Sequence, residues 1–463
     1  MAEIILCNGI VLTQDKKNPH ATAIAIKDGK FFAIGNDDVL LLKDAQTAIV
    51  DLNNKIVIPG FNDAHIHIWK VGNMLAYMLD LREVKSIEEM LDKLNDHIHA
   101  HPELEWIQAR GFNEANFKDK RFPNKNDLDT ISTTKPICVT RVCAHQIVVN
   151  SKALEIAGIN SATPTPAGGE IKKLNNGELG GHFTETATGL ILSKIPKYNA
   201  AQYREMILAA QDELIKYGIT SATDPAVEKD IIDVYKQMDR NGELKIRVNL
   251  FPIRVPDGAN KIYPLPEKYS SPHLKIDTVK FFADGGISGK TAALKKTYKN
   301  SNEHGVLRLD KELFLLLAKE TQDAGFRIAT HAIGDAAIEM VLDVYKRINE
   351  FNAQYINHRI EHLGLPTGDD LQLMKKLNVS AVMQPVFIYE LGKNFREYVD
   401  DDYLDYLYPL RRVMDAGINL SLSTDAPVVK NFDPLGNIRS AMERLDNDGF
   451  SIAPNEKITF EEA

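Results

Sequence analysis

The sequence predicts an α/β protein built around a (β/α)8 barrel, also called a TIM barrel. From Ala201 onward, helical patterns alternate with short apolar segments that favour β-strands. Counting the apolar segment 56–62 as the first strand gives eight β/α units with short connections, and crossovers of this kind make the strands parallel. Single polar residues end several of these segments, which is typical of the barrel face that carries function.

Composition and charge argue against several classes of protein. The chain has 463 residues, which suits one large α/β domain with additions. A formal net charge of -9 argues against nucleic acid or an anionic membrane surface as the main partner. Three cysteines are too few for a disulfide framework, and no apolar segment is long enough to span a membrane. We expect a cytoplasmic protein with a small-molecule substrate, and a homodimer is compatible with these features.

Residues 1–57 predict a small β-domain. Asp28-Gly29 is a hairpin signal, and short alternating apolar runs surround it. The expected strands span residues 4–6, 10–13, 22–27, 30–34 and 48–51.

The segment that follows carries two histidines with the spacing of metal ligands. Residues 55–58 are expected to form a buried strand that ends at Pro59-Gly60, shortly before His65 and His67. In an extended backbone alternate side chains point the same way, so both imidazoles can face one metal ion while Ile66 turns into the wall. A His-x-His pair in a surface turn would look the same, so the spacing alone does not decide.

Residues of about 70–200 predict a helical, loop-rich insertion after the first strand. Ser86 can cap a helix whose apolar positions from Ile87 to Ile98 follow a helical period. Long irregular loops around Gly168-Gly169 are typical of a lid or of a substrate-binding subdomain.

The barrel is expected over residues 58–450 and has a regular order of elements. Helices are expected at 202–217, 229–241, 311–324, 336–351, 370–377 and 410–416. Strands are expected at 219–224, 246–252, 276–283, 327–331, 358–362, 379–384 and 418–424.

Six residues of ligand type then fall at one face. His65 and His67 follow the first strand, and the others lie in or just after the fourth, fifth, sixth and eighth strands: Lys280, His331, His362 and Asp425. A single histidine at a strand end is usually structural, but several such coincidences at the functional face of a barrel favour a metal site.

Lys280 needs a separate argument because an ammonium group would repel a metal ion. It lies in the apolar strand Thr-Val-Lys-Phe-Phe, where burial lowers the pKa of a lysine and favours the neutral amine. A neutral amine can react with carbon dioxide to give a carbamate, an anion that can bridge two cations. The structural alternative is an ion pair with Asp284 or Asp224.

The chain resembles the amidohydrolase superfamily over almost its whole length, and in particular the branch that includes N-substituted formamide deformylases. The segments that carry the resemblance are 59–67, 279–285, 331–335, 359–362 and 423–427. The resemblance implies a hydrolase with one or two divalent ions, usually zinc. Their ligands would be His65, His67, carboxylated Lys280, His331, His362 and Asp425.

The resemblance has further implications outside the metal ligands. Segments 140–145, 150–154 and 180–185 match the same branch, so His145 and Glu185 are candidate substrate-binding residues, and for His145 a structural role within the insertion is equally open. Cys143 stands where relatives usually have Asp, which leaves local substrate contacts open. The N-terminal strands would belong to a β-sandwich completed by the C-terminus, so we expect residues 451–463 to begin the return to it and Ala463 to be a truncated end.

We expect the protein to hydrolyse a C–N bond in an amide, formamide or carbamate, with Asp425 as the catalytic proton carrier. A deaminase or another hydrolase on the same scaffold stays open, because fold and metal site do not determine the substrate. An inactive binding protein is the remaining alternative, which loss of a ligand would have favoured.

Overall fold

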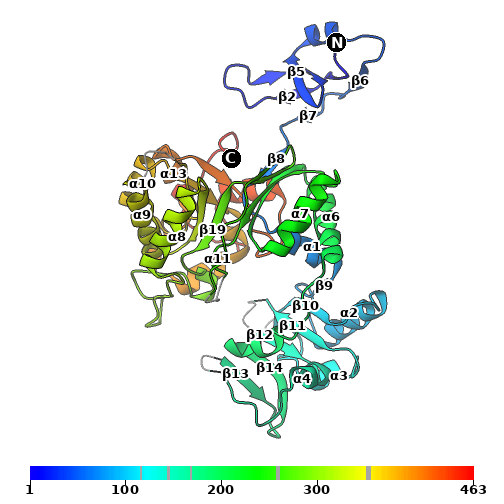
Figure 1. Ribbon diagram of the computed structural model, residues 1–463, viewed down its shortest axis with the longest axis vertical. Helices are drawn as coiled ribbons and strands as arrows, with labels where there is room; N and C mark the ends of the chain where they lie inside the picture. The colour runs from blue at the N-terminus through cyan, green and yellow to red at the C-terminus, as the bar shows by residue number, and fades with distance from the viewer. Residues whose placement is uncertain (115–116, 143–145, 167–168, 257–260, 351–355) are drawn as a thin grey trace. The chain divides into compact units, whose positions relative to one another are not determined.

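The computed structural model describes residues 1–114, 117–142, 146–166, 169–256, 261–350 and 356–463. It divides into two units, Met1–Asn62 and Asp63–Ala463, each described here by itself (Figure 1). Among the described residues no helix combines the length and the apolar character needed to cross a bilayer.

The first unit consists of two small sheets. One has the order β5–β4–β1–β6, with bounds Lys30–Gly35, Ala23–Lys27, Ile4–Cys7 and Ala48–Asp51. The other has the order β3–β2–β7, with bounds His20–Ala21, Ile10–Leu12 and Ile56–Val57. The 3-10 helix η1 spans Asp37–Leu42. Asp28 and Gly29 both have positive φ between β4 and β5, so the predicted hairpin is confirmed.

The prediction that residues 55–58 form a buried strand leading into the barrel is wrong. β7 (Ile56–Val57) pairs in parallel with β2 inside the first unit, and the side chain of Ile56 is 65% exposed. The strand that leads to the histidines is β8 (Phe61–Asp63), on the other side of Pro59-Gly60. Proline lacks the amide hydrogen that a continuous strand needs, so the chain is interrupted there and pairs with different neighbours before and after.

The second unit contains two mainly parallel sheets, in which the short strand β17 pairs antiparallel. The first has the order β17–β18–β16–β15–β8, in which β17, β18, β16 and β15 span Tyr269–Ser270, Leu274–Ile276, Arg247–Pro252 and Ile219–Val227. The second has the order β19–β20–β21–β22–β23, with bounds Thr278–Phe282, Arg327–Ala332, Arg359–His362, Ser380–Met383 and Leu420–Leu422.

Helices alternate with these strands, as the periodicity predicted. They are α1 (Ile68–Ala76), α6 (Ala200–Lys216), α7 (Lys229–Arg240), α8 (Lys311–Asp323), α9 (Asp335–Glu350), α10 (Gly368–Lys376), α11 (Val386–Tyr398), α12 (Asp401–Leu404), α13 (Leu410–Asp415) and α14 (Pro434–Glu443). The 3-10 helices η4 and η5 span Ile287–Gly289 and Pro454–Glu456. Apolar residues of α8, α9 and α10 share one core with the second sheet, and these helices cover its outer side in Figure 1.

Backbone contacts join the two sheets at two places. On one side Ile253 forms an isolated parallel bridge with Lys280, the central residue of β19. On the other side the amide of Asp425 donates to the carbonyl of His65 at 2.7 Å. Residues that follow the first and the last strands of this unit therefore lie next to each other.

The predicted helical insertion is instead built on a sheet, so that prediction is wrong in its main feature. The sheet has the order β13–β14–β12–β11–β10–β9, with bounds Gly169–Lys173, Leu179–Glu185, Gln146–Val149, Ile137–Arg141, Ile107–Phe112 and Met78–Asp80. Its helices are α2 (Ile87–Ala100), α3 (Lys125–Asp129), α4 (Ser151–Ala157) and α5 (Gly189–Leu192), with the 3-10 helix η3 at Thr186–Thr188. The cap of α2 is confirmed, because the Ser86 side chain accepts from the amide of Glu89.

A buried neutral histidine links β20 to the helices beside it. His358 Nδ1 accepts from the amide of Ile328 at 3.1 Å, so the ring proton is on Nε2, which donates to Gln322 Oε1 at 2.7 Å. Gln322 in turn donates to the carbonyl of Ile348. Burial lowers the pKa of His358 to about 3, because a second proton would remove an acceptor and place a charge in the core.

This arrangement predicts acid sensitivity. Between pH 6.5 and about 3 the unfolded chain binds a proton at His358 and the folded chain does not, so the free energy of unfolding falls as pH falls through that window, by about 1.4 kcal/mol per pH unit. In His358→Gln the free energy of unfolding should lack this contribution to its pH dependence. Urea unfolding of both proteins at pH 7, 6 and 5 measures the difference. His273→Asn, at an exposed position, is the control, and equal slopes in wild type and His358→Gln would contradict the assignment.

Candidate metal centre

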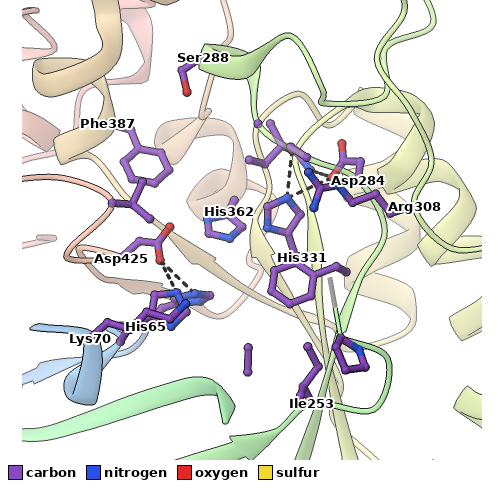
Figure 2. Close-up of a pocket in the computed structure, with 18 of the residues that line it drawn as sticks. His65, Lys70, Ile253, Asp284, Ser288, Arg308, His331, His362, Phe387 and Asp425 are labelled. Carbon is purple, nitrogen blue, oxygen red and sulfur yellow. Dashed lines mark hydrogen bonds and ion pairs between the residues drawn. The ribbon is translucent and has the colours of Figure 1, made fainter. Parts of the chain in front are cut away.

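Four of the six predicted ligands lie together in the structure. Asp425 Oδ1 is 3.4 Å from His65 Nε2 and 3.3 Å from His67 Nε2. The rings of His65 and His362 are 4.9 Å apart. Donor atoms of His65, His362 and Asp425 all lie within 4.8 Å of one another and are buried. Figure 2 shows these side chains pointing toward a common space.

The backbone around the two first histidines is held on both sides. The amide of Ile66 donates to the carbonyl of Thr223 on β15, and the amide of His67 donates to the carbonyl of Ala426. The side chain of Ile66 is fully buried, as the alternation of an extended segment predicts. His65 and His67 consequently both reach the Asp425 carboxylate.

Two of the clustered residues have a left-handed backbone. φ is +73° at His362 and +61° at Asp425, a region in which residues other than glycine are uncommon. Pro427 does not keep the chain extended at Asp425, because the direct restraint of a proline acts on the residue before it, Ala426. Such conformations cluster at functional sites, where the surroundings hold them in place.

Two of the histidines form hydrogen bonds through Nδ1 to side chains that the sequence did not indicate. His65 Nδ1 lies 2.5 Å from Glu361 Oε2, and His362 Nδ1 lies 2.8 Å from Gln384 Oε1. Burial alone would raise the pKa of Glu361, but Arg359 and His65 hold it well below its usual range. Both Nδ1 atoms therefore carry the ring proton, and both Nε2 atoms keep a free lone pair.

The donor set suits a divalent cation. Burial lowers the pKa of His65 and His362, and burial with the nearby charge of Lys70 lowers that of His67 to about 4, so these imidazoles are neutral. Among the described residues Asp425 Oδ1 has no hydrogen-bond partner although it is buried. The free lone pairs on Nε2 of His65 and His362, together with the Asp425 carboxylate, are the kinds of donor that bind a divalent cation.

Lys280 lies in β19 beside this cluster. Its side chain is fully buried, and burial lowers its pKa to about 8. Within the described part of the chain its Nζ has no hydrogen-bond partner. The predicted structural alternatives are not formed: Asp284 accepts from three backbone amides, and Asp224 accepts from the Tyr235 hydroxyl.

His331 is placed differently from the other predicted ligands. Its ring is 4.4 Å from that of His362, but its Nε2 faces the carbonyl of Gly285 at 3.0 Å and Asp284 Oδ1 at 3.3 Å. The dashed lines in Figure 2 mark these contacts. His331 lines the same space as the other histidines, but its Nε2 contacts Gly285 and Asp284 and not the other predicted ligands.

The two predicted substrate-binding residues of the insertion have no described side chain. His145 lies outside the described residues, as does Cys143, and nothing is described of the Glu185 side chain. Both assignments stay predictions.

A cavity of about 540 Å³ opens above the cluster. Aromatic side chains form part of its wall, among them Phe282, Phe387 and Tyr203. Charged residues of both signs also line it: Lys70, Lys197, Glu228, Asp230, Asp284, Arg308 and Asp425. The space is of the size that small-molecule sites usually have.

Comparisons with known proteins agree with this chemistry. A model of the amidohydrolase family matches residues 48–463. The putative amidohydrolase YtcJ of Bacillus subtilis is 28% identical, over 94% of this chain and 83% of its own. The N-substituted formamide deformylase of Arthrobacter pascens is 25% identical, over 100% and 88%. An uncharacterized metal-dependent hydrolase from Pyrococcus horikoshii has a TM-score of 0.83 at 25% identity, covering 99% of this chain and 90% of that one.

A buried imidazole and carboxylate donor set at the strand ends of an α/β fold, with these relatives, defines a metal-dependent hydrolase. The chain belongs to the amidohydrolase family. The predicted resemblance is confirmed, and so is the predicted class of enzyme, a hydrolase of carbon–nitrogen bonds.

The donor set predicts metal binding that can be measured without a substrate. Purified chain reconstituted at neutral pH is expected to retain up to two divalent ions, because the predicted ligands exceed what one tetrahedral ion needs. Elemental analysis gives the number. His362→Asn should retain less metal, whereas the exposed-site control His273→Asn should match wild type. Wild-type chain without bound metal would refute the assignment.

Proposed function

We propose that this enzyme hydrolyses a C–N bond in an amide, formamide or carbamate of a small molecule, at a centre of one or two zinc ions. The convergence of His65, His362 and Asp425 at the base of the cavity carries the proposal. The formamide deformylase among the relatives supports the class of bond. We also propose that the eight strands that alternate with helices are all parallel and close into one barrel, which the backbone contacts between the two sheets support.

The ligands that we propose are the six predicted residues. His65, His67 and His362 offer neutral imidazoles, and Asp425 offers a carboxylate. Carboxylated Lys280 and His331 complete the set, the latter once its ring gives up the contact with Gly285. Divalent ions bound there would lower the pKa of a water molecule and polarise the carbonyl of the substrate.

Other steps of the proposed reaction depend on side chains of this chain, which transfer the proton and exclude water. Asp425 holds one carboxylate oxygen toward His65 and His67, which leaves Oδ2 to take a proton from the attacking water and to return it to the departing amine. Burial alone would raise the pKa of Asp425, but the neighbouring imidazoles, His65 foremost, lower it, so the carboxylate starts ionised. The aromatic wall with Phe282 and Phe387 limits the access of bulk water.

Lys280 is positioned for carboxylation. Because burial brings its pKa to about 8, a useful fraction of the amine is neutral near pH 7.5, and its lone pair can attack carbon dioxide. The new N–C bond forms as one proton leaves the nitrogen, which yields a carbamate anion. Such an anion would replace an unpaired buried amine by a ligand for the cations.

A screen of the metal-loaded protein against N-acyl, N-formyl and carbamate compounds tests the proposal. Release of an amine together with an acid supports it. Release of ammonia from a ring or amidine would instead assign a deaminase on the same scaffold. Metal-loaded protein that binds such compounds and turns none over would favour the inactive binding protein.

Lys280→Ala is expected to lose metal and activity, because the bridging anion is removed. Added formate or acetate should restore part of both by standing in for the carbamate. Elemental analysis and turnover with and without the added acid measure this, and Lys319→Ala, on the surface of α8, is the control. An unmodified Lys280 amine in a metal-loaded, high-resolution crystal structure would refute the bridge.

Asp425→Asn is expected to keep the fold and most of the metal while turnover falls by roughly 10²-fold or more, since the amide cannot carry the proton. Substrate binding should change much less. Asparagine has nearly the size of aspartate and tolerates the left-handed backbone there. Asp323→Asn, at an exposed site on α8, is the control. Near-normal turnover in the metal-loaded variant would assign the proton transfer to another group, with His145 the next candidate.

A further inference from the structure

The two histidines that share the buried donor set are supported by groups of different charge. His65 Nδ1 faces the carboxylate of Glu361 at 2.5 Å, and His362 Nδ1 faces the amide oxygen of Gln384 at 2.8 Å. The Gln384 amide group also donates to Ser423 Oγ at 2.8 Å, which orients its oxygen toward the imidazole. Both supports fix the same tautomer, but only one of them is an anion.

Arg359 anchors the anionic support. It lies two residues before Glu361 on β21, so both side chains leave the strand on the same face. Its Nη2 donates to Glu361 Oε2 at 2.8 Å, and its Nε donates to Oε1. The guanidinium also lies over the ring of Phe251, at 4.6 Å from the centroid. These contacts fix the carboxylate of Glu361 in a single orientation.

The same guanidinium reaches the backbone just before the first histidine. Arg359 Nη2 donates to the carbonyl of Ala64 at 2.8 Å, and all of these groups are buried. Arg359 therefore holds His65 twice, through the backbone at Ala64 and through the ring by way of Glu361.

We propose that Glu361 is the positioning residue of the metal centre: it fixes His65 for ligation through Nε2 and strengthens the His65–metal bond, with Arg359 as its anchor. This rests on the proposed function in so far as a cation binds at His65. An imidazole that donates to a carboxylate is a more basic ligand than one that donates to an amide. Loss of such a partner typically weakens metal binding by 10–100-fold.

A purely structural role for Glu361 makes a different prediction, and the chain offers a matched control. Glu456 is also a buried glutamate paired with an arginine, with Oε1 at 2.8 Å from Arg412 Nε, and it does not line the cavity. Glu361→Gln and Glu456→Gln each remove one buried charge from such a pair. Glu361→Gln also gives His65 the kind of support that Gln384 gives His362.

The test is an equilibrium titration of the metal-free full chain with Zn²⁺ or Co²⁺ against a competing chelator, with thermal unfolding of the metal-free forms alongside. Glu361→Gln should bind 10–100-fold more weakly than wild type and alter the visible absorption of the Co²⁺ form. Glu456→Gln should bind like wild type even where it unfolds at lower temperature. Equal affinity of wild type and Glu361→Gln, or equal weakening in both variants, would overturn the inference.

Glu361→Asp covers the case in which Glu361→Gln does not fold. Aspartate keeps the negative charge beside Arg359 but withdraws the carboxylate from His65 Nδ1, so weaker binding is again expected and unchanged binding refutes the inference. Wild-type chain that binds neither ion would refute the proposed metal centre itself, so the two failures are distinguishable.

Discussion

The hydrogen bonds of the Asp63 carboxylate hold together the two chain segments that carry His65 and Asp425 of the candidate metal centre. Oδ2 accepts from the Thr424 hydroxyl at 2.6 Å, and Oδ1 accepts from the amides of His65 and Thr424 at 3.1 and 3.2 Å. Burial raises the pKa of Asp63 to about 7, so the group is retained at some cost in stability. The same carboxylate accepts from the backbone of His65 and from that of Thr424, the residue before Asp425. It therefore brings His65 and Asp425 together although they are far apart in the sequence.

The alternating part of the fold could be predicted because its signals are local. The helices α8 and α9 and the strand β20 between them follow from apolar periodicity that is recognised within one helical turn or one strand. The insertion sheet could not be predicted in this way, since strands such as Gln146–Val149 are short and acquire their pairing from partners distant in the chain. Similarly, the apolar character of residues 55–58 did not reveal which sheet they would join.

The site was predictable to the extent that ligand-type residues follow strands, and the sequence placed His65, His67, His362 and Asp425 correctly at the ends of their strands. It did not reveal their supports. Glu361 looks like a polar residue in a core strand, and only its position between Arg359 and the predicted ligand His362 could have drawn attention to it. The orientation of His331 depends on the Gly285 carbonyl and the Asp284 carboxylate, which belong to another strand's loop.

The left-handed backbone at His362 and Asp425 restricts what mutation can do there. Asparagine, aspartate and histidine tolerate this conformation better than other residues with a side chain, and β-branched residues least. Among these residues, aspartate and histidine are the ones that commonly bind zinc. An alanine scan at either position would therefore report backbone strain together with the loss of the side chain's donor atom.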